Sequence, residues 1–226
     1  MNMFGRRKTI SFRDAAEATH WLLVAVGEQH WVSHFSKHSN GTTQGFRSVY
    51  GGMGSFNDLV ICRANKHTID AAHEPLANQL LQSLSSICYA TSQNGDLSAQ
   101  DALASCGTTG NELHGWLCRD CGYGQVTRED MLAFAAFYDV AQAIHGGITS
   151  GSFLGSIQSL WKRLDPDENV SRFRPTAERS GIAYAESTGW MRPCPQCGGN
   201  DTCVYRWSFD GRDFTPSSDN LAMKTS

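Results

Sequence analysis

The sequence has no long apolar run and no surplus of basic residues. Its longest strongly apolar run covers residues 21–26, far short of the roughly 20 residues that span a bilayer. The basic cluster at residues 6–8 is not followed by an apolar stretch before Asp14, so we expect no export signal. The chain has 19 Lys and Arg against 22 Asp and Glu, unlike the strongly basic surface of a duplex-binding protein. We therefore expect a cytoplasmic protein with no membrane partner, and nucleic acid is not the favoured partner.

Two signatures of phosphate and metal chemistry are missing as well. The glycine-rich segment at residues 51–55 does not end in the Gly-Lys-Ser/Thr of a P-loop, and no lysine lies between Lys37 and Lys66. The His-Glu-x-x-His motif of zinc hydrolases is also absent from the sequence. The glycine segment is therefore interpreted as a tight turn, with a binding surface as the alternative.

Three histidines are nevertheless spaced at helical intervals. His30, His34 and His38 lie four residues apart, so a continuous helix would align them on one face. Glu28 precedes them instead of lying between them. This pattern favours a packing or solvated face. The alternative is a metal-dependent hydrolase that uses the His30 region together with Glu28 and Asp58.

The most specific pattern in the chain is a pair of Cys-x-x-Cys-Gly motifs. They supply four candidate ligands, Cys118, Cys121, Cys194 and Cys197. Four thiolates form the closed tetrahedral set of a structural zinc site, whereas a catalytic zinc usually keeps one position for water. Because 72 residues lie between Cys121 and Cys194, we expect a helical hairpin inserted between the two motifs. Two unrelated or redox-active pairs are the alternative.

The two cysteine motifs resemble the knuckles of zinc-ribbon proteins. Trp-x-Cys-x-x-Cys-Gly occurs at residues 116–122, and Cys-Pro-x-Cys-Gly-Gly at residues 194–199 precedes a predicted hairpin. The resemblance implies the metal but no particular function, because ribbons serve nucleic-acid binding, protein docking and bracing alike. A nucleic-acid-binding ribbon would use four candidate contacts, Arg119, Arg192, Arg206 and Trp207.

A second resemblance lies in the N-terminal half. Glu28-Gln29-His30-Trp31, followed by Gly-Gly-Met-Gly-Ser-Phe-Asn-Asp-Leu at residues 51–59, resembles a bacterial domain family of unknown function. The resemblance covers roughly residues 10–92. It implies a mainly helical domain in a bacterial or phage-associated cytosolic protein, and it implies no activity. The candidate binding surface on this segment consists of His30, Trp31, Gly52, Ser55, Asn57 and Asp58.

Helix caps and hydrophobic spacing predict an α+β fold. Capping boxes begin helices at Ser11 and Thr127, and the second of these helices is expected to stop at residues 146–147. Residues 59–62 are expected to form a buried strand and residues 165–181 an irregular segment. The predicted domains are a helical domain at residues 10–92 and a zinc ribbon with its helical insertion at 113–215. Residues 216–226 are expected to be a disordered tail.

Together these patterns predict a cytosolic zinc-binding protein that acts through contacts with a protein partner. An accessory protein or an immunity-like inhibitor is the expected type. The sequence favours a structural zinc ion as the cofactor and assigns no catalytic residue.

Overall fold

The computed structural model describes residues 8–107, 110–163, 165–187 and 193–218. The chain forms two compact units. The helical unit takes in the described residues up to 107 together with 139–163, and the sheet unit takes in 110–138 and the described residues from 165 onward. Helix α5 (Arg128–Ser150) begins in the sheet unit and ends in the helical unit. The predicted domain limits stay a prediction. The end of α5 and the helix that follows it belong to the same unit as the N-terminal residues.

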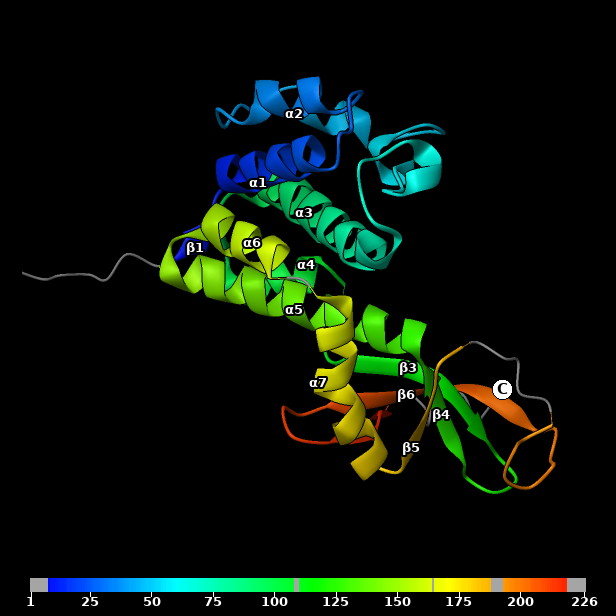
Figure 1. The fold of residues 1–226 in the computed structure, drawn as a ribbon. Coiled ribbons are helices and arrows are strands. Elements are labelled where there is room, and N and C mark those ends of the chain that lie inside the picture. The colour runs from blue at the N-terminus through cyan, green and yellow to red at the C-terminus, as the bar shows by residue number, and fades with distance from the viewer. Residues whose placement is uncertain (1–7, 108–109, 164, 188–192, 219–226) are drawn as a thin grey trace, which may run out of the picture. The chain divides into compact units, whose positions relative to one another are not determined.

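In the helical unit, α1 packs against α2, α3 and α6 (Figure 1). Strands β1 and β2 form an antiparallel pair. The elements of this unit besides α5 are β1 (Thr9–Ile10), α1 (Phe12–Ala25), α2 (Val32–His38), α3 (Glu74–Asn94), β2 (Leu97–Ser98), α4 (Ala99–Ser105), α6 (Phe153–Lys162) and the 3-10 turns η1 (Phe46–Val49), η2 (Phe56–Asp58), η3 (Arg63–Asn65) and η4 (Ala71–His73).

Local sequence signals explain where the long helices begin. The predicted capping box of α1 is confirmed, because the Ser11 side chain accepts from the Asp14 N–H and the Asp14 carboxylate accepts from the Ser11 N–H at 3.1 Å. Pro75 lies in the first turn of α3, where its missing N–H has no helical partner to lose. The core between these helices includes three fully buried rings, those of Phe35, Phe46 and Phe56.

The strand predicted at residues 59–62 is wrong. This segment pairs with no strand among the described residues, although Ile61 is fully buried. The side-chain amide of Asn78 on α3 accepts from the Ile61 N–H and donates to the Ile61 carbonyl, both at 2.8 Å. A helix side chain therefore satisfies the backbone groups that a neighbouring strand would have satisfied.

The sheet unit contains a five-stranded sheet in the order β5-β4-β3-β6-β7. All neighbouring strands are antiparallel except β4 and β5, which are parallel. Helix α7 packs against β5 (Figure 1). The elements besides α5 are β3 (Glu112–Cys118), β4 (Gly124–Thr127), α7 (Pro166–Arg179), β5 (Ile182–Ala185), β6 (Thr202–Phe209) and β7 (Phe214–Pro216).

An aromatic core fills the space between the sheet and its helices. Phe134 of α5, Phe173 of α7 and Phe209 of β6 meet at ring-centroid distances of 4.8–5.8 Å. Trp207 lies over two glycines of the sheet: a Cβ atom on Gly124 would come within 2.7 Å of the indole, and one on Gly115 within 3.1 Å. The glycines of β3 and β4 therefore leave the space that the Trp207 ring occupies.

The predicted α+β class is confirmed, and three expectations for the second half are corrected. Helix α5 does not stop at residues 146–147 but continues to Ser150. Gly147 is a helical position at which α6 approaches closely. Residues 166–179 form α7 instead of an irregular segment, begun by the Asp165 side chain, which accepts from the N–H groups of residues 167 and 168. The described residues between the two cysteine motifs therefore form β4, the three helices α5, α6 and α7, and β5, which is more than the expected helical hairpin.

The start of the predicted tail also belongs to the sheet unit. Pro216 ends β7, and Ser217 donates from its N–H to the Arg206 carbonyl and from its hydroxyl to Glu112. The remainder of that tail, residues 219–226, lies outside the described residues. None of the described helices combines the length and apolar character needed to cross a bilayer.

Candidate functional site

Two turns of the same geometry carry the four cysteines of the sheet unit. In the first turn, the Gly122 N–H donates to the Cys118 carbonyl at 2.8 Å; in the second, the Gly198 N–H donates to the Cys194 carbonyl at the same distance. Both glycines have positive φ, +77° and +73°, a conformation that costs glycine little. The Cys-x-x-Cys-Gly sequence thus determines a tight turn that presents two thiols on one side.

The sheet brings the two turns together. The first turn follows β3 and the second precedes β6, and Cys118 is paired with Thr202 in the β3–β6 ladder. The Arg119 N–H donates to the Asp201 carbonyl at 2.8 Å, and the side chains of these two residues form an ion pair at 3.7 Å. The pairing of β3 with β6 therefore brings together two turns that are separated by 72 residues in the sequence.

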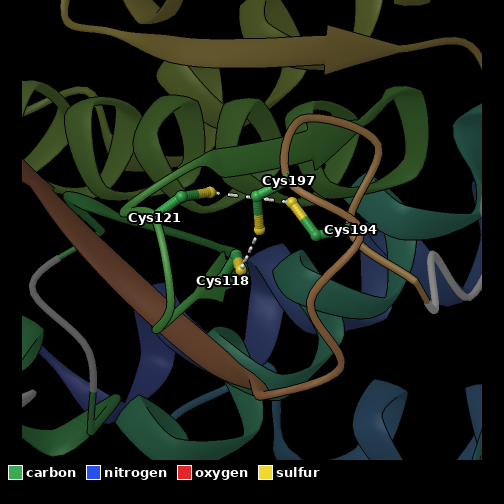
Figure 2. A group of neighbouring side chains, drawn as sticks. All are labelled: Cys118, Cys121, Cys194 and Cys197. Atoms are coloured by element: carbon green, nitrogen blue, oxygen red, sulfur yellow. Dashed lines mark hydrogen bonds between the residues drawn. The ribbon is translucent and has the colours of Figure 1, made fainter.

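The four sulfur atoms point toward one another (Figure 2). All four Sγ atoms lie within 4.8 Å of one another, with Cys118–Cys197 at 3.7 Å and Cys121–Cys194 at 3.8 Å. These separations exceed a disulfide bond of about 2.05 Å. They match the roughly 3.8 Å between sulfurs that surround a tetrahedral ion at about 2.3 Å. The four predicted ligands are brought together, and they could hold one metal ion.

The pKa values of the clustered thiols also favour the binding of a cation. Burial opposes the Cys194 thiolate, but the N–H groups of Cys197 and Gln196 and the neighbouring thiols outweigh burial and lower its pKa to about 7. The Gly199 N–H favours the Cys197 thiolate, yet the neighbouring thiols and burial raise its pKa to about 12. Four sulfurs this close cannot all be anionic without a positive charge between them. A bound divalent ion removes that conflict.

The predicted histidine stripe is not one continuous helical face. Helix α2 contains His34 and His38, and His30 lies before it. The rings of His34 and His38 are 4.6 Å apart, but His34 stacks on Phe46 at 5.7 Å and Nδ1 of His38 hydrogen-bonds with the Thr42 carbonyl. Burial and the nearby His38 and Lys37 lower the pKa of His34. Within the described residues, the four cysteines are the only group of three or more His, Cys, Asp or Glu placed to share an ion.

The residues of the predicted loop surface have different roles. Ser55 and Asp58 bond each other: the Ser55 N–H donates to the Asp58 carboxylate at 3.0 Å, and the Asp58 N–H donates to the Ser55 carbonyl at 3.0 Å. Gly52 is exposed and has φ of +85°. Asn57 is exposed at the middle of η2. Ser55 and Asp58 therefore brace the turn, whereas the side-chain amide of Asn57 is available for other hydrogen bonds.

His30 and Trp31 connect this loop to α2. Their rings are 4.7 Å apart in an edge-to-face arrangement, and the Trp31 ring lies 5.5 Å from that of Phe56 in η2. Phe56 in turn lies 4.7 Å from Phe35. The aromatic pair thus packs beside the loop and attaches it to the helical core.

A hydrogen bond between the Glu28 carboxylate and the buried His67 ring, which sequence reasoning missed, holds the ends of this region together. Nε2 of His67 lies 3.0 Å from the Glu28 carboxylate, and their side chains are 3% and 11% exposed. The other Glu28 oxygen accepts from the N–H groups of His30 and Trp31 at 2.6 and 3.1 Å. Burial opposes the Glu28 charge, but these backbone N–H groups and His67 outweigh it, so the pKa of Glu28 is lowered. Only the position of Glu28 just before His30-Trp31 signalled such a role.

The predicted nucleic-acid contacts are not presented as a surface. Trp207 is 5% exposed in the aromatic core, so it offers no face on which a base could stack. Arg119 pairs with Asp201, and Arg206 lies 3.7 Å from the Glu112 carboxylate. Arg192 lies outside the described residues.

Residues 24–70 match the family model of a domain of unknown function (DUF6966). The predicted resemblance of the N-terminal half to a family of unknown function is thereby confirmed. The matched segment contains both Glu28 and His67, together with Trp31 and the glycine loop. The cysteine cluster lies outside it. No curated protein and no solved structure matches the chain.

Proposed function

We propose that the protein is a zinc-binding protein without catalytic activity, in which one structural zinc braces the sheet unit and the helical unit contacts a protein partner. The observation that carries this proposal is the closed set of four thiols with sulfur separations of 3.7–3.8 Å for the two closest pairs. Four thiolates fill a tetrahedral ion and leave no position for a substrate or an activated water. The proposed zinc ion therefore has a structural role.

The donor chemistry favours zinc among the metals that accept such a set. Four soft thiolates in a tetrahedron select zinc or an iron–sulfur centre, and they disfavour magnesium and calcium, which take oxygen ligands. Thiolate ligands must stay reduced, so we place the protein in the reducing cytoplasm.

A protein partner is favoured over nucleic acid by the charge arrangement. The chain has a net charge of −3, and Arg119 and Arg206 of the sheet unit pair with carboxylates. Binding to phosphates needs a surplus of positive charge and weakens steeply with salt. An accessory protein or an immunity-like inhibitor remains the type of role that we propose.

Elemental analysis of the purified protein tests the metal. We expect one zinc per chain, less than a tenth of an equivalent of iron, and loss of the zinc in a Cys118→Ser, Cys194→Ser double variant. A matched Cys88→Ser, Cys106→Ser variant alters two buried thiols outside the cluster and is expected to keep its zinc. Iron at one equivalent, or zinc that persists without Cys118 and Cys194, contradicts the proposal.

A further inference from the structure

We propose that a cleft between η2 and α3 of the helical unit binds an extended, uncharged segment of a partner polypeptide. This inference deepens the proposed function and rests on the part of it that makes the partner a protein. The cleft has a volume of about 420 Å³, within the range of about 300–1,000 Å³ typical of ligand sites. Asn57 and Leu59 line it from the loop side, and Asn78, Gln82 and Ser86 line it from α3.

The lining of the cleft is neutral and rich in amides. None of the residues that line it is charged, and Phe56 and Leu81 provide a buried apolar floor. An ionised ligand would lose its hydration there without gaining a counter-charge. The cleft therefore favours an uncharged ligand with hydrogen-bonding groups.

Several of these polar groups have unused hydrogen-bonding capacity. The Asn78 amide donates to the Ile61 and Glu74 carbonyls and accepts from the Ile61 N–H, so it is a structural part of the wall. The side chains of Asn57, Gln82 and Ser86 form no hydrogen bond with any other residue that the structure describes. An amide side chain carries the same donor and acceptor groups as a peptide bond. Asn57 and Gln82 can therefore each bond the N–H and the C=O of one residue in an extended peptide, as Asn78 does with Ile61.

The spacing of the α3 residues matches an extended chain. Asn78, Gln82 and Ser86 follow one another at intervals of four residues, which is about 6 Å of rise along a helix. In an extended chain, groups that face the same way recur at about 6.6 Å. Gln82 and Ser86 can thus bond successive same-facing peptide groups, with Asn57 on the opposite wall. The span from Asn78 to Ser86, about 12 Å, accommodates three to four extended residues.

The same lining disfavours the other neutral ligands. A sugar or a nucleobase is commonly held by stacking on an aromatic face, but Phe56, which is the aromatic residue of this lining, is only 2% exposed. The loop wall is bordered in sequence by exposed apolar side chains, Met53 at 104% and Val60 at 52%. Methionine is enriched at protein interfaces relative to the rest of the surface.

The test is a selection of displayed seven-residue peptides that lack charged residues, carried out on the zinc-loaded full chain. Selected peptides are synthesised with blocked ends, and their affinity is measured for the parent chain and for Gln82→Leu and Asn57→Ala. We expect each variant to weaken binding about tenfold, equivalent to about 1.4 kcal/mol and the loss of a hydrogen-bonded pair. N-methylation of one peptide nitrogen is expected to weaken it similarly.

Gln93→Leu is the matched control, because Gln93 is an exposed glutamine of the same helix that does not line the cleft. It is expected to change the affinity less than twofold. If the selected peptides bind the Gln82→Leu and Asn57→Ala variants as tightly as the parent chain, the cleft is not their binding site. That result would contradict this inference without contradicting the proposal of a protein partner. A selection that enriches no peptide relative to an Asn57→Ala, Gln82→Leu double variant also overturns it. Zinc content measured on the same samples tests the metal separately.

Discussion

The helical unit and the sheet unit are stabilised by different means. The helical unit buries aromatic and aliphatic side chains between capped helices, and Phe35, Phe46 and Leu80 are completely buried. The sheet unit has an aromatic core on one part of its sheet, but two of its four clustered cysteines are exposed and lie in turns away from that core. Apolar burial is the main feature of the first unit, whereas in the second the two cysteine turns are placed so that they could share a metal ion.

Removal of the metal should produce the largest difference between the units. Binding of a structural zinc contributes on the order of 10 kcal/mol to folding. We therefore expect a strong chelator to expose the amides of β3, β4 and β6 to hydrogen exchange while α1 and α3 stay protected. Exchange followed by mass spectrometry on peptides from each unit measures this directly.

An equal loss of protection in α1 and α3 would contradict the separation of the two units. The Cys121→Ser variant is a second route to the same test, because Cys121 is exposed and its substitution leaves the core unchanged. Addition of zinc should restore protection to the chelated parent chain and not to that variant.

Gly115→Ala should cause the next largest effect, confined to the sheet unit. A Cβ atom at this position would lie 2.5 Å from the Gln125 carbonyl oxygen and 2.7 Å from Cγ1 of Val126. Overpacking of this kind costs about 1–3 kcal/mol, so we expect a loss near 3 kcal/mol in urea unfolding of the zinc-loaded protein. Gly211→Ala is the control within the same unit: it has φ of +99° but no neighbouring atom within 4 Å. A smaller loss for Gly115→Ala than for this control would contradict the close approach of β3 and β4.

Residues that act on near neighbours were predictable from the sequence. Ser11 with Asp14, Thr127 with Asp130, and each Cys-x-x-Cys turn all depend on contacts three to five residues apart. The meeting of the two turns was predictable because one tetrahedral ion needs four thiols.

The features that the sequence did not predict depend on contacts between residues that are far apart along the chain. Residues 59–62 have the composition of a strand, but Asn78, far along the chain, satisfies the backbone of Ile61. Glu28 and His67 are 39 residues apart and belong to no motif that implies a pair. In α7, Val170, Phe173 and Ala177 lie on one buried face, a spacing that the charged residues around them and Pro175 obscured.

Glu28→Gln should cause a moderate loss, confined to the helical unit. The charged carboxylate bonds His67 and two backbone N–H groups, and hydrogen bonds to a charged group contribute about 1.5–3 kcal/mol. The pKa of Glu28 is lowered below its usual value of 4.5, so its stabilising effect is complete above that pH and is lost as the pH falls through the folded-state value.

The difference in unfolding free energy between the parent chain and Glu28→Gln should therefore be largest near pH 7 and shrink in acid. Denaturant titrations at several pH values measure it, with exposed Glu17→Gln on α1 as the control that should change little. A difference that is constant from pH 7 to pH 3 would show that shape, not charge, matters at this position.

Two adjacent glycines of α5 give the smallest expected effects, and their signs should be opposite. A Cβ atom on Gly146 would meet no atom within 4 Å, whereas one on Gly147 would lie 3.0 Å from the Phe153 Cα and 3.3 Å from the Phe153 carbonyl oxygen. Alanine is favoured over glycine within a helix by about 0.8–1.0 kcal/mol, so Gly146→Ala should raise the unfolding free energy of the helical unit by up to that amount. The same gain at Gly147 should be outweighed by the collision with the backbone of α6, for a net loss of about 1 kcal/mol. Thermal unfolding of the two variants in parallel decides this. A gain at both positions would mean that α5 and α6 do not approach at Gly147, and a loss at both would mean that the helix is interrupted there, as the glycine pair alone suggested.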